Sequence, residues 1–355
     1  MKGNNMTKTY WQVMAGSYGR EYSKYFLKYG IAFVGGIKQE AEILKTKVGD
    51  IIVLKKGRSE IIAAGEIVER NGCHNGNVKA GKHRDKEWLR DIDGWDLPGF
   101  CYVDWYESSD NKQDNSPPVG LTRRTICGID KKEIQDQADD ILSRGVKRKK
   151  EDEPKLFNSI KEDMLIMTIL NKLPKNTTEQ RVKYEFKQIT KLAQYYIEEG
   201  EKNERCKDRG INWGDIREHE VRTFLVIPLL LALGWKKENL KIELPCKVDK
   251  GHGKIDIACF NSSYTSGSND LKLIIETKGF GSGLDYALNQ AKQYAKAYQN
   301  CKTLVVSNGY SFKSYKENRA DFTPHAYLNL LKPTDKYPLD TSVGGGTELL
   351  EDLLP

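Results

Sequence analysis

Short apolar runs separated by glycine and asparagine fill the chain from about residue 9 to about residue 130. They are YWQVMAG, GIAFVGG, GDIIVLKKG, IIAAGEIV and FCYVDWY. Runs of this length, bounded by turn-forming residues, predict β-strands, and several in one segment predict a small barrel or curled sheet. The polar segment 107–118 contains two prolines, and we expect it to be a loop.

Residues 131–212 are highly charged and lack strand patterns. Their apolar residues recur at helical spacing, which predicts helices at 134–143, 156–173 and 178–199. The run RGVKRKKEDEPK lies between the first two of these helices. We expect this run to be a solvated linker, and the alternative is a contact with phosphate groups.

From about Trp213 onward the pattern predicts helix, strand, strand, strand, helix and strand. The segment IREHEVRTFLVIPLLLALGW, residues 216–235, is the first of these helices. We expect Pro228 to kink it or to begin its second half, and Gly234 to cap its end. One apolar stripe at helical spacing contains Val221, Phe224, Leu225, Pro228, Leu229 and Ala232.

Length and composition are consistent with a globular chain of more than one domain. The chain has 355 residues, of which 38% are hydrophobic and 30% are charged. The longest apolar run, 224–233, is shorter than the roughly 18 residues that span a bilayer, and the N-terminus lacks a hydrophobic signal core. We therefore expect a cytoplasmic protein without membrane contact. Its expected parts are a β-rich domain 1–130, a helical linker 131–212 and an α/β domain 213–355.

Charge and cysteine content add little to this picture. The formal net charge of +7 suits a polyanionic partner, although surface lysines alone would also produce it. The seven cysteines are dispersed and none are paired as CxxC. We expect reduced thiols that serve mostly as packing residues.

Three charged residues in the C-terminal part form a pattern with chemical meaning. In GKIDIACF, Asp256 alternates with Ile255 and Ile257, so a strand would place it on the opposite face. In LKLIIETKG, Glu276 and Lys278 are two residues apart and would share a face of the next strand. If the two strands pair, the three side chains converge at one position of the sheet.

Such a set is suited to hydrolysis of phosphodiester bonds. Two carboxylates can hold a hard divalent cation such as Mg²⁺, which neutralises phosphate charge and makes bound water more acidic. A nearby lysine can orient or deprotonate the attacking water and stabilise developing negative charge. The alternative is a solvated strand face or a salt bridge, because an E-x-K pattern on a strand is common.

Residues on the two flanking helices strengthen the catalytic interpretation. Glu218 lies at the edge of the apolar stripe of the helix 216–235, whereas Glu220 lies outside it. A carboxylate that faces the core is costly unless it meets a metal or a cation, so Glu218 is the better candidate for the site. Gln290 and Tyr294 share a face of the helix predicted at 282–298.

These residues, in this order, resemble the PD-(D/E)XK nuclease superfamily. The resemblance is greatest to the nuclease domain at the N-terminus of type I restriction motor subunits, and it covers about 213–332. The segments that carry it are E-H-E-V-R…P-L-L-L-A-L-G-W, the strand with Asp256, E-T-K at 276–278, Q-x-x-x-Y at 290–294, and V-V-S-N-G.

The resemblance implies a four-stranded mixed sheet flanked by helices and DNA cleavage that depends on Mg²⁺, with Mn²⁺ as a substitute. By position, Asp256 and Glu276 would bind the metal, and Glu218 would assist in binding it. Lys278 would orient or deprotonate the attacking water, and Gln290 would support the site. The proline ten residues after the acid again selects Glu218. The chain departs from the family in its longer loop between Asp256 and Glu276. We also expect no translocation motor.

The first 130 residues resemble PUA-like modules, the superfamily that includes the SRA, EVE and YTH domains that recognise modified bases. Y-W-Q-V-M-A-G, G-D-I-I-V-L-K-K-G and A-A-G-E-I-V carry this resemblance. Such a domain extrudes a base into a pocket and stacks it on aromatic rings. The candidate wall residues are Trp11, Tyr18, Trp95, Tyr102 and Trp105, and the candidates for contact with a base edge are Asp93 and Asp96.

Any one of these aromatic residues is more often a core residue than a ligand contact. The strongest candidates for contact with a base are Trp11 and Trp95. Trp11 lies at the start of the first strand, and Trp95 lies in the polar turn DIDGWDLPG.

The two resemblances together imply a modification-dependent restriction enzyme that cleaves double-stranded DNA carrying modified bases. Because each strand needs its own active site, we expect a homodimer. Two alternatives stay open. One is a nuclease specific for unmodified DNA sequence or structure, and the other is a non-catalytic protein that binds nucleic acid, RNA included.

Overall fold

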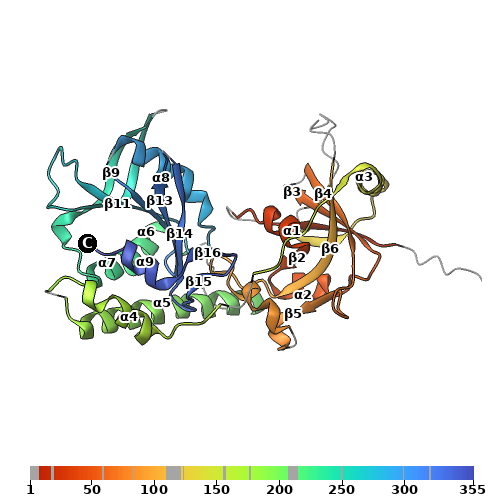
Figure 1. Cartoon of the computed structure of the whole chain (residues 1–355), viewed down its shortest axis with the longest axis horizontal. Helices are drawn as coiled ribbons and strands as arrows, with labels where there is room; N and C mark the ends of the chain where they lie inside the picture. The colour runs from red at the N-terminus through yellow and green to blue at the C-terminus, as the bar shows by residue number, and fades with distance from the viewer. Residues whose placement is uncertain are drawn as a thin grey trace, which may run out of the picture. The chain divides into compact units, whose positions relative to one another are not determined.

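The chain divides into two compact units, Met1–Leu156 (unit 1) and Phe157–Pro355 (unit 2), which Figure 1 draws from red to yellow-green and from yellow-green to blue. The computed structural model describes residues 8–16, 20–57, 60–81, 83–108, 121–122, 124–154, 157–175, 177–206, 215–248, 251–298, 300–319 and 321–355. The helices predicted within 131–212 are divided between the units. The first packs against a core of unit 1, and the other two pack against the core of unit 2.

Unit 1 is built on a half-barrel sheet with the strand order β2-β6-β4-β3-β1-β7, and β5 and β8 also pair with β6. Among the described strands of unit 1, only β1 and β3 pair in parallel. Each strand predicted from an apolar run is confirmed. The strands are β1 Tyr10–Met14, β2 Ile31–Val34, β3 Ile51–Lys56, β4 Glu60–Ile67, β5 Asn75–Asn77, β6 Gly99–Glu107, β7 Ile126–Gly128 and β8 Val146–Lys147.

The long strand β6 gives the sheet its curl. Its first half pairs with β2 and β5, and its second half pairs with β4 and β8. The helix α3 covers one face, where Ile134 and Ala138 pack on Ile51, Val53 and Ala64. The helices of unit 1 are α1 Ser23–Tyr29, α2 Ile37–Ile43 and α3 Lys132–Arg144, with 3-10 turns at Val78–Ala80 and Arg84–Arg90.

The basic run after α3 differs from the expected solvated linker. Val146 and Lys147 form β8, which pairs with β6. The backbone N–H of Arg148 donates to the carbonyl of Trp105 at 2.8 Å, and that of Glu151 donates to the carbonyl of Lys28 at 2.7 Å. The run is therefore fixed along the surface of unit 1.

Unit 2 contains a mixed sheet of eight strands in the order β15-β16-β14-β13-β12-β11-β10-β9. The β11–β12 and β14–β16 pairs are parallel. The sheet is larger than the four strands that the resemblance implied, because the chain after Gly309 adds β13 to β16. The strands are β9 Leu240–Val248, β10 Gly251–Phe260, β11 Leu271–Thr277, β12 Thr303–Ser307, β13 Ser311–Asn318, β14 Asp321–Asn329, β15 Lys336–Tyr337 and β16 Asp340–Gly344.

The two faces of this sheet have different neighbours. Ile257 and Cys259 of β10 and Ile275 of β11 belong to the main core, together with apolar residues of α4, α5, α7 and α9. By alternation, Asp256 and Glu276 lie on the opposite face, where α8 packs (Figure 1). The helices of unit 2 are α4 Glu162–Ile169, α5 Glu179–Cys206, α6 Glu218–Val221, α7 Ile227–Ala232, α8 Asp285–Ala297 and α9 Gly346–Asp352, with 3-10 turns at Leu170–Lys172 and Lys237–Asn239.

The helix predicted at 216–235 is present but is not uniform. A π-helical turn, Arg222–Val226, separates α6 from α7. Pro228 stands in the first turn of α7 and begins the second half of the helix, as expected. Because proline has no N–H and its ring crowds the carbonyl four residues earlier, the preceding turn widens. The π turn also shifts the phase of the side chains, so Phe224, placed in the apolar stripe by regular spacing, is 50% exposed.

Gly234 ends α7 in a Schellman motif, which confirms the predicted cap. Its φ is 104°, its N–H donates to the carbonyl of Leu231 at 3.3 Å, and the N–H of Trp235 donates to the carbonyl of Leu230 at 3.1 Å.

Two further expectations can be compared with the structure. All cysteines whose side chains are described are free thiols, and all of these except Cys73 are buried, as expected for packing residues. Among the described residues, no helix combines the length and the apolar character that crossing a bilayer requires.

The Schellman glycine offers a test of the packing around α7. A Cβ at Gly234 would lie 2.7 Å from both Pro174 Cγ and Thr177 Oγ1, whereas a Cβ at Gly267, which also has positive φ, would meet nothing within 4 Å. We expect Gly267→Ala to lower the free energy of unfolding by ~1–3 kcal/mol through backbone strain alone. Gly234→Ala should lose more, because the overlap adds a further ~1–3 kcal/mol. Urea titration followed by circular dichroism measures both, and equal losses would contradict the described packing.

Candidate active site

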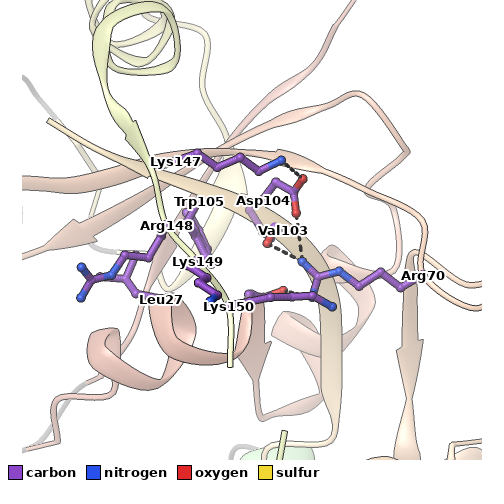
Figure 2. Close-up of a pocket in the computed structure, with 10 residues that line it drawn as sticks. Leu27, Arg70, Val103, Asp104, Trp105, Lys147, Arg148, Lys149 and Lys150 are labelled. Atoms are coloured by element: carbon purple, nitrogen blue, oxygen red, sulfur yellow. Dashed lines mark hydrogen bonds and ion pairs between the residues drawn. The ribbon is translucent and has the colours of Figure 1, made fainter. Parts of the chain in front are cut away.

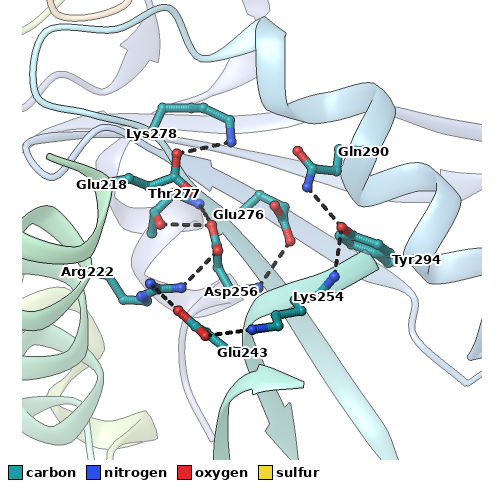
Figure 3. A network of polar contacts seen from close by, with 10 residues as sticks. All are labelled: Glu218, Arg222, Glu243, Lys254, Asp256, Glu276, Thr277, Lys278, Gln290 and Tyr294. Atoms are coloured by element: carbon teal, nitrogen blue, oxygen red, sulfur yellow. Dashed lines mark hydrogen bonds and ion pairs between the residues drawn. The ribbon is translucent and has the colours of Figure 1, made fainter. Parts of the chain in front are cut away.

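Asp256 and Glu276 lie side by side on neighbouring strands. The register of β10 and β11 pairs Ile257 with Ile275, which places Asp256 opposite Glu276. The backbone N–H of Asp256 donates to Oε1 of Glu276 at 3.3 Å (Figure 3). Asp256 is 8% exposed and Glu276 is fully buried. The convergence predicted from the alternation of the two strands is therefore present.

The carboxylate of Asp256 is held from both sides. Nη1 of Arg222 donates to Oδ1 at 2.8 Å. The backbone N–H and the hydroxyl of Thr277 donate to Oδ2 at 2.7 and 2.8 Å. Hydrogen bonds to a charged carboxylate stabilise that form and fix its direction.

Glu276 has a different environment. Its Oε2 atom is buried and has no hydrogen-bond partner among the described residues. Burial, followed by the negative charge of Asp256, raises the pKa of Glu276 from 4.5 to about 8. Near neutral pH this carboxyl therefore keeps its proton until a cation favours its ionised form.

Lys278 and Glu218 meet at the end of β11. The backbone N–H of Lys278 donates to the carbonyl of Ser307 at 2.8 Å, and its Nζ lies 3.4 Å from Oε2 of Glu218. Burial and the charge of Asp256 raise the pKa of Glu218. Glu220 instead accepts from the backbone N–H of Arg217 at 2.9 Å and caps α6. Of the two acids compared in the sequence, Glu218 is the one that faces Lys278.

Gln290 and Tyr294 of α8 contact the other side of the site. Nε2 of Gln290 donates to the hydroxyl of Tyr294 at 2.9 Å, and the backbone N–H of Lys254 donates to the same hydroxyl at 3.2 Å. A Cβ at Gly253 would lie 2.5 Å from that hydroxyl, so only glycine allows this approach. Among the described residues, no hydrogen bond joins Gln290 to Asp256 or Glu276, so it is connected to β10 through Tyr294.

Three further charged residues of the site were not predicted from the sequence. Nη2 of Arg222 donates to Glu243 at 3.1 Å, and Nζ of Lys254 donates to the same carboxylate at 3.2 Å (Figure 3). Glu243 interrupts the β9–β10 ladder opposite Asp256, with a φ of 51°. Positive φ at a residue other than glycine is strained and is concentrated at functional sites.

A signal for Arg222 was present in the sequence. Arg222 follows Glu218 by four residues and shares its helix face. It is also a cation within a strongly apolar segment, and such a side chain requires a partner when it is buried. The structure leaves Arg222 only 7% exposed.

The residues present are compatible with a magnesium ion. Within the described part of the chain, no three side chains of His, Cys, Asp or Glu are arranged to hold a metal. Mg²⁺, however, commonly takes one or two carboxylates and completes its shell with water and substrate phosphates. Asp256 and Glu276 supply such a pair, and the unpartnered Oε2 of Glu276 is a free oxygen ligand.

In unit 1, three of the candidate base-contacting aromatics lie in the core. Trp11, Tyr102 and Trp105 are all buried. The indole N–H of Trp11 donates to Asp50 Oδ2 at 3.0 Å, which gives this residue a structural partner. Tyr18 lies outside the described residues.

The turn that contains Trp95 is more accessible. Trp95 is partly exposed, and the guanidinium carbon of Arg20 lies 3.5 Å from its ring centroid. Asp96 accepts from Nε of Arg90 at 2.8 Å. Asp93 is buried and its carboxylate lies 3.5 Å from the hydroxyl of Tyr22. Of the candidates for base contact, Trp95 and Asp96 are those that combine exposure with polar surroundings.

Residues 217–328 match a family model described as the type I restriction enzyme R protein N terminus (HSDR_N). The match includes α6, β9 to β13, α8 and every residue of the candidate site. It relates this part of the chain to restriction enzymes. No curated protein and no solved structure is significantly similar to the chain.

The raised pKa of Glu276 predicts a pH-dependent stability. The folded chain binds this proton more tightly than the unfolded chain does, because the pKa rises from 4.5 to about 8. The resulting stabilisation is complete below pH 4.5 and is lost as the pH rises toward 8.

In EDTA, the thermal midpoint of the wild type should therefore fall relative to that of Glu276→Gln between about pH 5 and pH 8. Glu238→Gln, at an exposed acid of unit 2, is the control and should run parallel to the wild type. Parallel curves for Glu276→Gln as well would rule out the raised pKa.

The Arg222–Asp256 ion pair can be tested with a double-mutant cycle. Arg222→Met should lower the free energy of unfolding by ~3–5 kcal/mol, because it leaves the buried charge of Asp256 uncompensated. In Arg222→Met/Asp256→Asn the charge is also removed, so the combined loss should be smaller than the sum of the single losses. Urea unfolding of the four proteins in EDTA measures the coupling, and additive losses would contradict the pairing.

Proposed function

We propose that the chain is a Mg²⁺-dependent DNA endonuclease of the PD-(D/E)XK type and acts in a restriction system. The observation that carries this proposal is the meeting of Asp256, Glu276, Lys278 and Glu218 at one end of the β10–β11 pair. The match of residues 217–328 to the restriction enzyme family model supports it.

Asp256 and Glu276 would hold the metal, and Glu218 would assist from the end of α6. When bound, Mg²⁺ would neutralise charge on the phosphodiester and make a coordinated water more acidic. Because the pKa of Glu276 is raised to about 8, a cation would compete with its proton, so metal binding should tighten as the pH rises toward 8. Arg222 compensates the charge of Asp256 in the meantime.

Lys278 would orient the attacking water. Its ammonium group is held near Glu218 and is only partly exposed, so its direction is set by the site. It can orient the water and stabilise negative charge on the phosphate as the phosphorus–oxygen bond to the leaving group breaks. Gln290 and Tyr294 support the site by fixing β10 against α8.

Unit 1 would select the target. Its half-barrel sheet is compatible with a PUA-like module, and Trp95, Asp93 and Asp96 lie within one turn beside Arg20. We assign to it the recognition of a modified base in double-stranded DNA. One active site cuts one strand, so cleavage of both strands calls for a homodimer.

The nuclease proposal is tested by DNA cleavage. The wild-type chain should cut DNA with Mg²⁺ and not with EDTA, and Mn²⁺ should substitute. Lys278→Ala should lower the cleavage rate by ~10²-fold or more, the usual contribution of a group that moves or orients a proton. Lys236→Ala, at an exposed lysine of unit 2, is the control and should cleave at the wild-type rate. Equal rates for Lys278→Ala and the control would exclude the assigned role.

The substrate set decides what unit 1 recognises. It contains duplexes that are unmodified or carry 5-methylcytosine, 5-hydroxymethylcytosine, glucosylated hydroxymethylcytosine or N6-methyladenine. Cleavage of one modified duplex above the others supports base recognition, and Trp95→Ala should then lose that preference. Equal cleavage of all duplexes would leave the nuclease and remove the recognition of a modified base. Cleavage of none with Mg²⁺ would favour a non-catalytic protein that binds nucleic acid.

A further inference from the structure

A pocket with a volume of about 460 Å³ opens on unit 1, beside β6 and the end of α1. Leu27, Val103 and Trp105 form its apolar wall, and Arg70 and the basic run 147–150 form its rim (Figure 2). Its volume is within the roughly 300–1,000 Å³ of pockets that bind small molecules or single nucleotides.

The basic run is held at the mouth of this pocket by its backbone. Lys147 pairs with Tyr106 in the β6–β8 ladder, and the N–H of Arg148 donates to the carbonyl of Trp105 at 2.8 Å. The N–H of Glu151 donates to the carbonyl of Lys28 at 2.7 Å. Backbone bonds on both sides therefore give four consecutive cationic side chains a fixed position.

The charges around the pocket do not balance. Its lining contains five cationic side chains and one acid, Asp104. That carboxylate already pairs with Arg70 at 3.1 Å and with Lys147 at 2.6 Å. Within the described residues, Lys149 and Lys150 are exposed and have no carboxylate within ion-pair distance. A concave surface with this excess of positive charge attracts an anion.

The wall of the pocket is apolar. Leu27, Val103 and Trp105 line it and are buried. The pocket therefore offers a cationic rim beside an apolar wall.

We propose that this pocket binds a phosphodiester group of a DNA strand. Lys149 and Lys150 contact the phosphate, and Leu27 and Trp105 face the attached nucleotide. The choice of DNA as the anion rests on the proposed function, but the site is separate from the catalytic residues and from the turn that contains Trp95. Phosphate contacts give affinity without sequence preference and make binding dependent on salt.

Binding is measured on the full chain carrying Lys278→Ala, in EDTA, so that cleavage does not interfere. Fluorescence anisotropy of a labelled duplex is recorded over a range of salt concentrations. Adding Lys149→Ala/Lys150→Ala should weaken binding by ~10-fold or more and lower the slope of log K against log salt by about 2. The control pair, Lys38→Ala/Lys47→Ala, removes the same charge at exposed positions outside the pocket and should leave the slope unchanged.

A small phosphate compound is the alternative occupant of the pocket. Inorganic phosphate and a nucleoside monophosphate, added at constant ionic strength, serve as competitors. Loss of their binding in the Lys149/Lys150 variant with DNA binding intact would overturn the proposal in favour of a small phosphate ligand.

The outcomes separate this inference from the proposed function. Cleavage by the wild type, with unchanged DNA binding in the Lys149/Lys150 variant, removes the pocket proposal and leaves the nuclease. DNA binding that depends on these lysines, in a chain that cleaves no substrate, keeps the pocket and removes the nuclease. Binding of RNA but not of DNA would overturn both.

Discussion

The register between β10 and β11 is the constraint on which the candidate site depends. It pairs Ile257 with Ile275 and so brings Asp256 against Glu276. A slip of either strand by one residue would turn its isoleucine away from the core and its carboxylate into it. The apolar residues on one face of these strands therefore determine the chemistry on the other, since the core of α4, α5 and α7 accepts only one register.

Two neighbouring carboxylates with so little exposure repel each other, and the structure compensates each in a different way. Asp256 receives hydrogen bonds from Arg222 and Thr277. Glu276 keeps its proton, because its pKa rises to about 8. Arg222 comes from the π-helical turn that precedes Pro228, so a local irregularity of the helix supplies the cation that the sheet requires.

Sequence alternation and helical spacing were sufficient to predict the parts of the site that depend on local pattern. The positions of Asp256, Glu276 and Lys278 follow from two strands with clear apolar faces, and that of Glu218 from the stripe of one helix. Glu243 could not be predicted, because its contact with Arg222 depends on a positive φ and on a partner 21 residues away.

The same limit applies to the fold. The five apolar runs of unit 1 are strands, whereas β14 contains Pro324 and several polar residues and lacks a strand pattern. Strand β8 has only two residues, which is too short for any periodicity, so the basic run that contains it was expected to be a linker. Trp11 was a candidate ligand contact because Asp50, its hydrogen-bond partner, is 39 residues distant and cannot be inferred from the sequence.

The charge of the candidate active site bears on how DNA would be bound. The cations of the site already form ion pairs with its acids. Arg222 pairs with Asp256 and Glu243, Lys254 pairs with Glu243, and Lys278 pairs with Glu218. Such a site offers little attraction to a phosphate backbone before a metal is present. In the proposed enzyme, affinity for DNA must then come from cations that are free of carboxylate partners. Lys149 and Lys150 of unit 1 have that property, and a phosphate contact there would let binding and chemistry depend on different residues.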